Sequence, residues 1–203
     1  MDPEATSSGF GKDQLQFFHV LERLKTQKRT GWVENKIVNA ESISDHMHRM
    51  ALLALCVTDK SVDKERCALL ATVHDIAEAQ VGDIAPSHGI SKMEKHRMET
   101  DAMHNFVVKM LHSGPAGLRI QELWQEYEDQ VTPEARLVKD LDLFEMALQA
   151  MEYEKGSPNG MRLDNFFETS IPRIKHLEVQ GWAGELLKER AEFWSTVFAD
   201  TSV

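Results

Sequence analysis

The chain has 203 residues, of which 42% are hydrophobic, and its formal net charge is −10 at pH 7. This length supports one compact domain with a core and is short for two. Because an acidic chain repels a polyanion at long range, the charge argues against a nucleic-acid polymer as a partner, but not against a small phosphorylated ligand at a bound metal. Every apolar run is too short to cross a bilayer, so no membrane partner is expected.

The N-terminal residues are polar and contain glycine and serine, without the basic start and apolar run of a targeting segment. Residues 1–11 are expected to form a disordered tail, and residues 12–200 a single domain. The two cysteines, Cys56 and Cys67, lie in apolar helical stretches, which favours buried free thiols over a disulfide. Free thiols without a signal peptide indicate a reducing compartment, so the expected location is cytoplasmic.

Apolar residues recur at helical spacing in nearly every segment outside the loops. In chain order, the predicted helices cover residues 14–26, 42–57, 63–80, 92–111, 117–128, 132–155 and 182–198. Ser42 is a plausible helix cap, and Thr132 followed by Pro133 is typical of a helix start. No segment shows the sustained alternation of a half-buried strand, so the pattern predicts an all-α fold, a single helical bundle.

Polar side chains occupy several positions where these helices would otherwise present apolar residues to the core. His46 and His74 each continue an apolar stripe, Asp75 follows His74 directly, and Asp142 lies beside the stripe of the helix over 132–155. Glu78 follows His74 one turn later, on the same face of the predicted helix. Burying an unpaired charge costs several kcal/mol, so these carboxylates need a partner.

The set of two histidines and two aspartates from three predicted helices indicates a metal site between helices. A lone core histidine is usually hydrogen-bonded rather than a ligand, and a His-Asp pair alone is a weak signal. Imidazole with carboxylate suits a borderline or hard divalent cation, and the absence of cysteine argues against a closed structural zinc site. His96 and Arg97 fit a solvated charged face, with a phosphate contact as the alternative.

The order H…HD…D formed by His46, His74-Asp75 and Asp142 resembles the signature of the HD-domain metal-dependent phosphohydrolases, which have an all-helical fold. The similarity is closer to their 5'-deoxynucleotidase branch, the bacterial YfbR-like enzymes and the eukaryotic HD domain-containing protein 2 group. The resemblance covers roughly residues 12–155. It is carried further by the strings RTGW at 29–32, ESISDH at 41–46, VHDIAE at 73–78, VGDIAP at 81–86, EKHR at 94–97 and VKDLD at 138–142.

This resemblance implies hydrolysis of deoxyribonucleoside 5'-monophosphates to deoxyribonucleoside and phosphate by a cytoplasmic homodimer. It implies a divalent cation, Mn²⁺, Co²⁺ or Mg²⁺, whose ligands are His46, His74, Asp75 and Asp142. Glu78 would position or deprotonate the attacking water, and Asp83 would donate a proton to the leaving group. In some eukaryotic members a second cation lies near Glu78, Asp83 and the carbonyl of Ile84, which would compete with proton donation by Asp83.

The substrate contacts also follow from the resemblance. Trp32 matches the family tryptophan that packs near the sugar. The bacterial enzymes carry an arginine directly before that tryptophan, where this chain has Gly31, so Arg29 is the nearest candidate to replace it. Lys139 and Arg97 complete the expected substrate contacts.

Two other functions compete with a nucleotidase. Another HD phosphohydrolase substrate, such as a cyclic nucleotide, a nucleoside triphosphate or an alarmone, would use the same metal site. Alarmone hydrolases carry an HDxxED string, whereas Ala79 follows Glu78 here, and the extra histidines of the cyclic-nucleotide enzymes are not evident. A binding or regulatory module without turnover is the least favoured, because every ligand and both acid–base candidates are present.

Overall fold

The computed structural model describes residues 3–157 and 160–200, and within these ranges the fold is all-α, as predicted. Lys28 and Ser42 form an isolated antiparallel bridge. Three short elements are the 3₁₀ helices η1 (Pro86–His88) and η3 (Ile171–Arg173) and the π-helical segment η2 (Asn105–Met110). The α-helices are α1 (Pro3–Thr26), α2 (Thr30–Glu34), α3 (Ile43–Cys56), α4 (Lys64–Val73), α5 (Glu78–Val81), α6 (Lys92–His104), α7 (Pro115–Asp129), α8 (Pro133–Gly156), α9 (Asp164–Ser170) and α10 (Leu177–Asp200).

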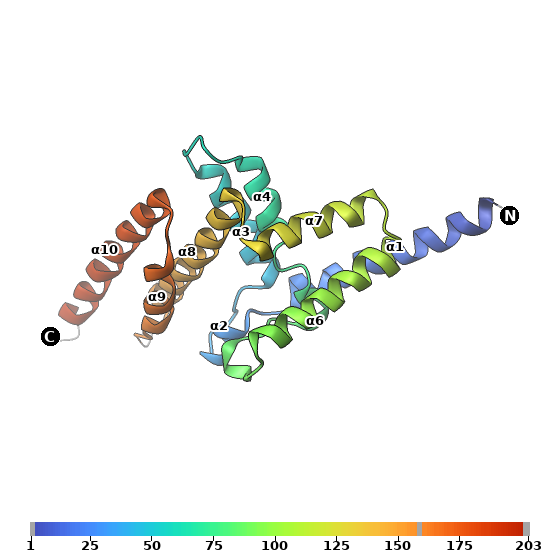
Figure 1. Ribbon diagram of the computed structural model, residues 1–203. Helices are drawn as coiled ribbons and strands as arrows, with labels where there is room; N and C mark the ends of the chain where they lie inside the picture. The colour runs from blue at the N-terminus through green and yellow to red at the C-terminus, as the bar shows by residue number, and fades with distance from the viewer. Residues whose placement is uncertain (1–2, 158–159, 201–203) are drawn as a thin grey trace.

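Helix α8 is the centre of the bundle, because α3, α4, α7, α9 and α10 all pack against it. Its apolar stripe includes Leu137, Leu141 and Met151, which are buried in the core. Each such side chain contributes about 1.5–3 kcal/mol on burial. Helix α1 contacts α3, α5 and η2, and it lies at the opposite end of the molecule from α10 (Figure 1). Within the described ranges, no helix is both long and apolar enough to cross a membrane.

Side-chain caps set the starting points of the helices that carry the site. Ser42 accepts a hydrogen bond from the Asp45 amide, and Asp45 accepts one from the Ser42 amide, which forms a capping box at the start of α3. Thr132 caps α8 by accepting from the Ala135 amide, with Pro133 in the first turn. Both predicted helix starts are therefore confirmed, and such caps contribute about 1 kcal/mol each.

The helix predicted over residues 63–80 is interrupted. α4 ends at Val73, and the turn that follows leads into the short helix α5, which begins at Glu78. Backbone bonds between residues three apart tighten this turn, from the Ile76 amide to the Val73 carbonyl and from the Glu78 amide to the Asp75 carbonyl. The periodic stripe alone cannot reveal this break, because every residue in the turn still has a helix-compatible side chain.

Two further expectations, on the helix over 92–111 and on Cys56, differ from the structure. The helix predicted to reach residue 111 changes at Asn105 into η2, where the Leu111 amide bonds the Phe106 carbonyl, five residues back. Cys67 is buried, and burial raises the pKa of its thiol to about 12, whereas Cys56 in the last turn of α3 is exposed. That side of α3 faces solvent, so the expectation of a buried Cys56 is wrong.

The segment expected to be a disordered tail is helical from Pro3, where α1 begins; residues 1–2 lie outside the described ranges. Proline is well tolerated in the first turn of a helix. Gly11, inside α1, costs about 1 kcal/mol relative to alanine, which is too little to interrupt a helix that continues on both sides. Loop-like composition therefore does not break the helix here.

The C-terminal helix α10 is tied to α8 by a buried carboxylate. Glu154 is fully buried and accepts hydrogen bonds from the Leu163 amide at 2.6 Å, from Arg190 Nε at 2.7 Å and from Trp194 Nε1 at 2.9 Å. A buried charge is tolerated only when its oxygens are satisfied in this way. The segment after residue 160 therefore closes one side of α8.

Candidate active site

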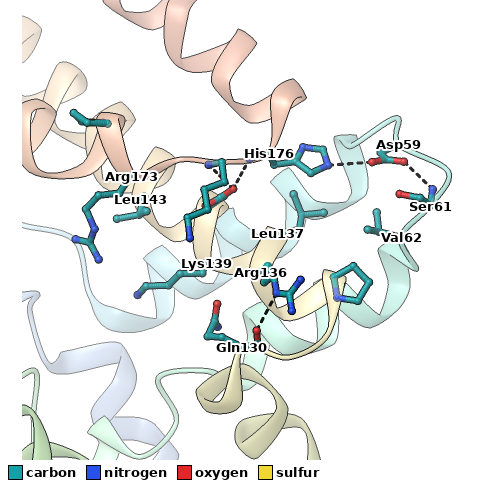
Figure 2. Close-up of a pocket in the computed structure, with 14 residues that line it drawn as sticks. Asp59, Ser61, Val62, Gln130, Arg136, Leu137, Lys139, Leu143, Arg173 and His176 are labelled. Atoms are coloured by element: carbon teal, nitrogen blue, oxygen red, sulfur yellow. Dashed lines mark hydrogen bonds and ion pairs between the residues drawn. The ribbon is translucent and has the colours of Figure 1, made fainter.

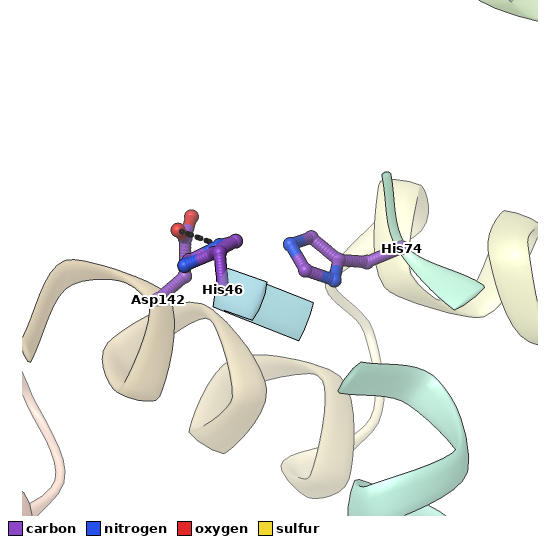
Figure 3. Close-up of side chains that lie close together, drawn as sticks. All are labelled: His46, His74 and Asp142. Atoms are coloured by element: carbon purple, nitrogen blue, oxygen red, sulfur yellow. Dashed lines mark ion pairs between the residues drawn. The ribbon is translucent and has the colours of Figure 1, made fainter. Parts of the chain in front are cut away.

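The four predicted metal ligands converge at the centre of the bundle. His46 comes from the first turn of α3, His74 and Asp75 from the turn after α4, and Asp142 from α8. The Nε2 atom of His46 lies 3.3 Å from Asp142 Oδ1 and 3.9 Å from Asp75 Oδ2. His74 Nε2 lies 3.1 Å from Asp75 Oδ2. Figure 3 shows the imidazoles of His46 and His74 and the carboxylate of Asp142 pointing toward one another.

The outer nitrogens of both imidazoles are engaged by the protein, which leaves the inner ones free. His46 Nδ1 lies 2.6 Å from Oε2 of the buried Glu145, whose other oxygen accepts from Arg49. His74 Nδ1 donates to the Ala71 carbonyl at 2.9 Å. In a neutral imidazole whose Nδ1 carries the proton, Nε2 has a lone pair, and in both residues that lone pair would be directed into the site. This is how metal-binding histidines are usually oriented.

These residues fit a divalent cation. The Nε2 atoms of His46 and His74 are buried and make no well-aligned hydrogen bond to any described residue, although carboxylate oxygens lie close by. Buried polar atoms without a partner are costly, and two of them converging on Asp75 and Asp142 need a ligand. Imidazole nitrogen with carboxylate oxygen is a donor set for borderline or hard divalent metals.

The electrostatic field of the site also favours a cation. Burial and Arg29 lower the pKa of His46, but Glu145 and Asp142 outweigh them and raise it to about 9. Burial alone would raise the pKa of Asp75 and Asp142, yet the pKa of each is held well below its usual range, by His74 for the first and by Lys139 and His46 for the second. Both carboxylates are therefore ionised at neutral pH.

The two predicted acid–base residues line one cavity of about 380 Å³ with three of the ligands. Glu78 is only 3% exposed, and its Oε2 is buried without a hydrogen-bond partner in the described part of the chain. Burial, and then the charges of Asp75 and Asp83, raise the pKa of Glu78 well above its usual value. A carboxylate with a raised pKa is a competent general base near neutral pH.

Asp83 is held at the entrance of helix α2. The Thr30 amide donates to Asp83 Oδ2 at 2.6 Å, and the Thr30 hydroxyl donates to the Asp83 carbonyl at 2.6 Å. The preceding Gly82 has a φ of 82°, a left-handed conformation that favours glycine and turns the chain toward α2. Arg29, just before α2, places Nη1 3.5 Å from Asp75 Oδ2, so it reaches the metal ligands.

Trp32 closes a smaller apolar cavity of about 180 Å³ next to Asp83. The indole is 1% exposed, donates from Nε1 to Glu41 Oε1 at 2.8 Å, and stacks on Phe166 of α9 with a centroid separation of 4.3 Å. Met146 of α8 also lines this cavity. An apolar slot thus lies beside the polar cavity that holds the metal ligands.

Of the remaining predicted substrate contacts, the structure brings Lys139 to the site but not Arg97. Lys139 donates from Nζ to Asp142 Oδ2 at 2.8 Å. Arg97 is exposed on α6, where its guanidinium pairs with Glu94 and Asp101, and it does not line the cavity. Arg97 lies two positions after Lys95, which does line the cavity, and the helix rotates by about 200° over that step, which turns Arg97 away.

Three site residues escape the sequence reasoning. Glu145 lies one turn after Asp142 on the buried stripe of α8, and the rule that identified Asp142 would also have found it. Tyr127 of α7 donates from its hydroxyl to Asp142 Oδ2 at 3.3 Å. Lys95 of α6 faces Glu78. Lys95 lies within the string EKHR at 94–97 but received no role, and nothing in the local pattern marks Tyr127, because each reaches the site from a separate helix.

A larger cavity of about 610 Å³ lies on the other side of Lys139 (Figure 2). Its wall includes Arg136, Arg173 and His176, and Figure 2 shows His176 directed toward Asp59. None of the four predicted metal ligands lines it. Three of the predicted ligands and both acid–base candidates line the smaller cavity instead.

Comparisons with known proteins show the family of this chain. The family model of the HD domain matches residues 21–180. A Danio rerio protein named 5'-deoxynucleotidase HDDC2 is 49% identical over 179 residues, which cover 88% of each chain. The Homo sapiens protein of that name is 45% identical over 190 residues, covering 92% of this chain and 91% of its own. The Schizosaccharomyces pombe 5'-deoxynucleotidase hdd1 is 45% identical over 188 residues, covering 90% and 93%.

Solved structures show the same fold. The HD domain-containing protein YGK1 superposes with a TM-score of 0.66 at 31% identity, over 95% of each chain. A predicted metal-dependent phosphohydrolase from Magnetospirillum magnetotacticum MS-1 superposes with a TM-score of 0.68 at 25% identity, over 91% of this chain and 94% of its own. With its H…HD…D residues brought together in space, this chain belongs to the HD domain family.

Proposed function

We propose that this protein is a metal-dependent 5'-deoxynucleotidase, a phosphoric monoester hydrolase that converts deoxyribonucleoside 5'-monophosphates to deoxyribonucleoside and phosphate. The observation that carries the proposal is the convergence of two unsatisfied imidazole nitrogens and two carboxylates beside Glu78 and Asp83. The activity named for relatives 49% and 45% identical to this chain over most of its length supports the substrate class.

His46, His74, Asp75 and Asp142 would hold the divalent cation, for which we propose Mn²⁺, Co²⁺ or Mg²⁺. When bound, such an ion neutralises phosphate charge and makes water more acidic. Glu78 accepts a proton from the attacking water. The oxygen of that water forms a bond to phosphorus while the bond between phosphorus and the 5'-oxygen breaks. The buried position of Glu78 suits this role, because its raised pKa makes it a stronger base than an exposed glutamate.

Asp83 is the proposed donor of the proton that the departing 5'-oxygen requires. It lines the same cavity as Glu78, and its tether to Thr30 fixes its position. The alternative is that Glu78, Asp83 and the carbonyl of Ile84 hold a second cation, in which case Asp83 is ionised and cannot donate. Lys139 and Arg29, whose cationic groups lie beside Asp142 and Asp75, are the proposed phosphate contacts.

The test is phosphate release from paired deoxy and ribo 5'-monophosphates and from 3'-monophosphates, after chelation and then with added Mn²⁺, Co²⁺ or Mg²⁺. Chelation is expected to stop release, and metal to restore it for the 5'-deoxy compounds and not for the 3'-compounds. Equal metal-restored release from 3'-monophosphates would contradict the 5'-specificity. Failure of every metal, despite metal binding measured by calorimetry, would favour another HD phosphohydrolase substrate or a nucleotide-binding module.

Trp32→Ala is expected to lower the preference for deoxyribose over ribose by about 10-fold, with little change in metal affinity. The indole and Phe166 wall the apolar slot beside Asp83, and an apolar wall disfavours a 2'-hydroxyl that it cannot hydrogen-bond. The measurement is the ratio of kcat/KM for the deoxy and ribo forms of one 5'-monophosphate. An unaltered ratio would remove Trp32 from the specificity role.

Three expectations about the whole protein stay predictions. A homodimer is supported by Leu52, Leu55 and Leu69, large apolar side chains of α3 and α4 that are about half exposed. The net charge of −10 argues against a nucleic-acid polymer as partner. The cytoplasmic location is supported by the two free cysteines.

A further inference from the structure

Glu78 forms an ion pair with a lysine of another helix. Lys95 of α6 places Nζ 3.6 Å from Glu78 Oε1 and lines the same cavity. The ammonium is partly shielded, because the Lys95 side chain is 34% exposed and the Glu78 side chain 4% exposed. An ion pair in such surroundings is screened less than one on an open surface.

Glu78 lies close to two other carboxylates, which repel its charged form. Asp75 and Asp83 both act on it through unfavourable charge, while Lys95 and then Arg29 oppose them. Arg29 is already directed at Asp75, with Nη1 3.5 Å from Oδ2, and at Glu41. Lys95 is therefore the cation paired directly with Glu78 among the described residues.

The pair divides the two oxygens of the carboxylate between two tasks. Oε1 faces the ammonium of Lys95, whereas Oε2 is buried and has no hydrogen-bond partner among the residues described. A general base needs one oxygen free to accept a proton and a carboxylate that does not rotate. Anchoring Oε1 leaves Oε2 for the proton.

Glu99 restrains the ammonium from the other side. It lies one turn after Lys95 on α6, its Oε1 is 3.3 Å from Lys95 Nζ, and its side chain is 12% exposed. A lysine held between two poorly exposed carboxylates has fewer accessible rotamers than a lysine that extends freely into solvent. The order Glu99, Lys95, Glu78 thus links α6 to the start of α5.

We propose that Lys95 is a positioning residue of the hydrolysis, which holds Oε1 of Glu78 so that Oε2 accepts the proton of the attacking water. The inference rests on the proposed function, because it assigns a partner to the base of that reaction. Lys95 itself contacts no reacting atom in this role. Its loss should therefore affect turnover far more than substrate affinity.

The experiment measures kcat and KM with one deoxyribonucleoside 5'-monophosphate for wild type, Lys95→Met, Lys95→Arg and Glu99→Gln, with circular dichroism to verify folding. Lys95→Met is expected to lower kcat about 10- to 100-fold with KM changed less than about 3-fold. Lys95→Arg restores most of the loss, because it keeps the positive charge. Glu99→Gln lowers kcat less, by about 3- to 10-fold.

Lys109→Met is the matched control, since it removes an equal charge from an exposed position of η2 and should leave kcat unchanged. An unchanged kcat in Lys95→Met, or a rise in KM alone, would overturn the proposal. A Lys95→Arg variant as slow as Lys95→Met would also overturn it, because the positive charge at this position would then not be what the reaction requires. If the wild type is inactive, both the proposed function and the role of Lys95 are contradicted. If the wild type is active, the variants test the role of Lys95 alone.

Discussion

Asp142→Ala is expected to reduce metal-dependent phosphate release by about 1,000-fold or more. Asp142 supplies the carboxylate of α8 to the donor cluster, with Oδ1 3.3 Å from His46 Nε2. Loss of a ligand removes several kcal/mol of charge stabilisation in the transition state, and each 1.36 kcal/mol is about a factor of ten in rate. The substitution also leaves Lys139 without the carboxylate that its Nζ contacts at 2.8 Å.

The measurement is phosphate release at saturating metal, with metal stoichiometry determined on the same preparation. The helical circular dichroism spectrum should persist, because Asp142 is not part of the apolar stripe of α8. Asp129→Ala is a suitable control, since Asp129 is an exposed aspartate at the end of α7 that accepts a hydrogen bond from Gln125. Turnover at the wild-type level in Asp142→Ala would contradict the assignment of Asp142 as a metal ligand.

Glu145→Ala is expected to lower the free energy of unfolding by about 3–5 kcal/mol and metal affinity by about 10- to 100-fold. Glu145 is fully buried. Its Oε2 lies 2.6 Å from His46 Nδ1, and its Oε1 accepts a hydrogen bond from Arg49 Nε at 2.7 Å. Removing it leaves a buried imidazole without the group that fixes its tautomer. Arg49 would lose both of its hydrogen bonds to Glu145 and keep the one that it donates to Gln149.

Chemical denaturation gives the stability change, and calorimetric titration with Mn²⁺ gives the affinity change. Glu145→Gln should fall between wild type and alanine, because the amide oxygen still accepts one hydrogen bond. Glu152→Ala is the matched control from the exposed side of the same helix. If Glu145→Ala binds Mn²⁺ as tightly as the control, Glu145 does not orient the ligand His46, and its role is confined to stability.

The predicted metal ligands could be picked out from the sequence because the signal that marks each of them is local. His46, His74 and Asp142 stand out as polar groups on or beside apolar stripes, and a stripe reports which way a side chain faces within its own helix. The caps at Ser42 and Thr132 are local in the same sense, since a cap contacts an amide three residues away. The family resemblance then adds roles that no periodicity can supply.

Short elements and irregular turns left too little pattern to be predicted. Helix α2 has five residues and α9 seven, which is fewer than two full turns each. The apolar spacing continues through the turn between α4 and α5, although the helix does not. The prediction that Glu78 lies on the same helix face as His74 assumed one continuous helix, and that assumption is wrong.

By itself, the sequence determined the all-α class and the helix starts at Ser42 and Thr132, and it singled out the four candidate ligand side chains, because each of these signals depends on residues within one or two turns. Only the tertiary structure decided which helices bring Lys95 to Glu78, Phe166 to Trp32 and Glu145 to His46. These contacts join residues far apart in the chain. They depend on how whole helices pack, and local periodicity carries no information about the distance between two helices.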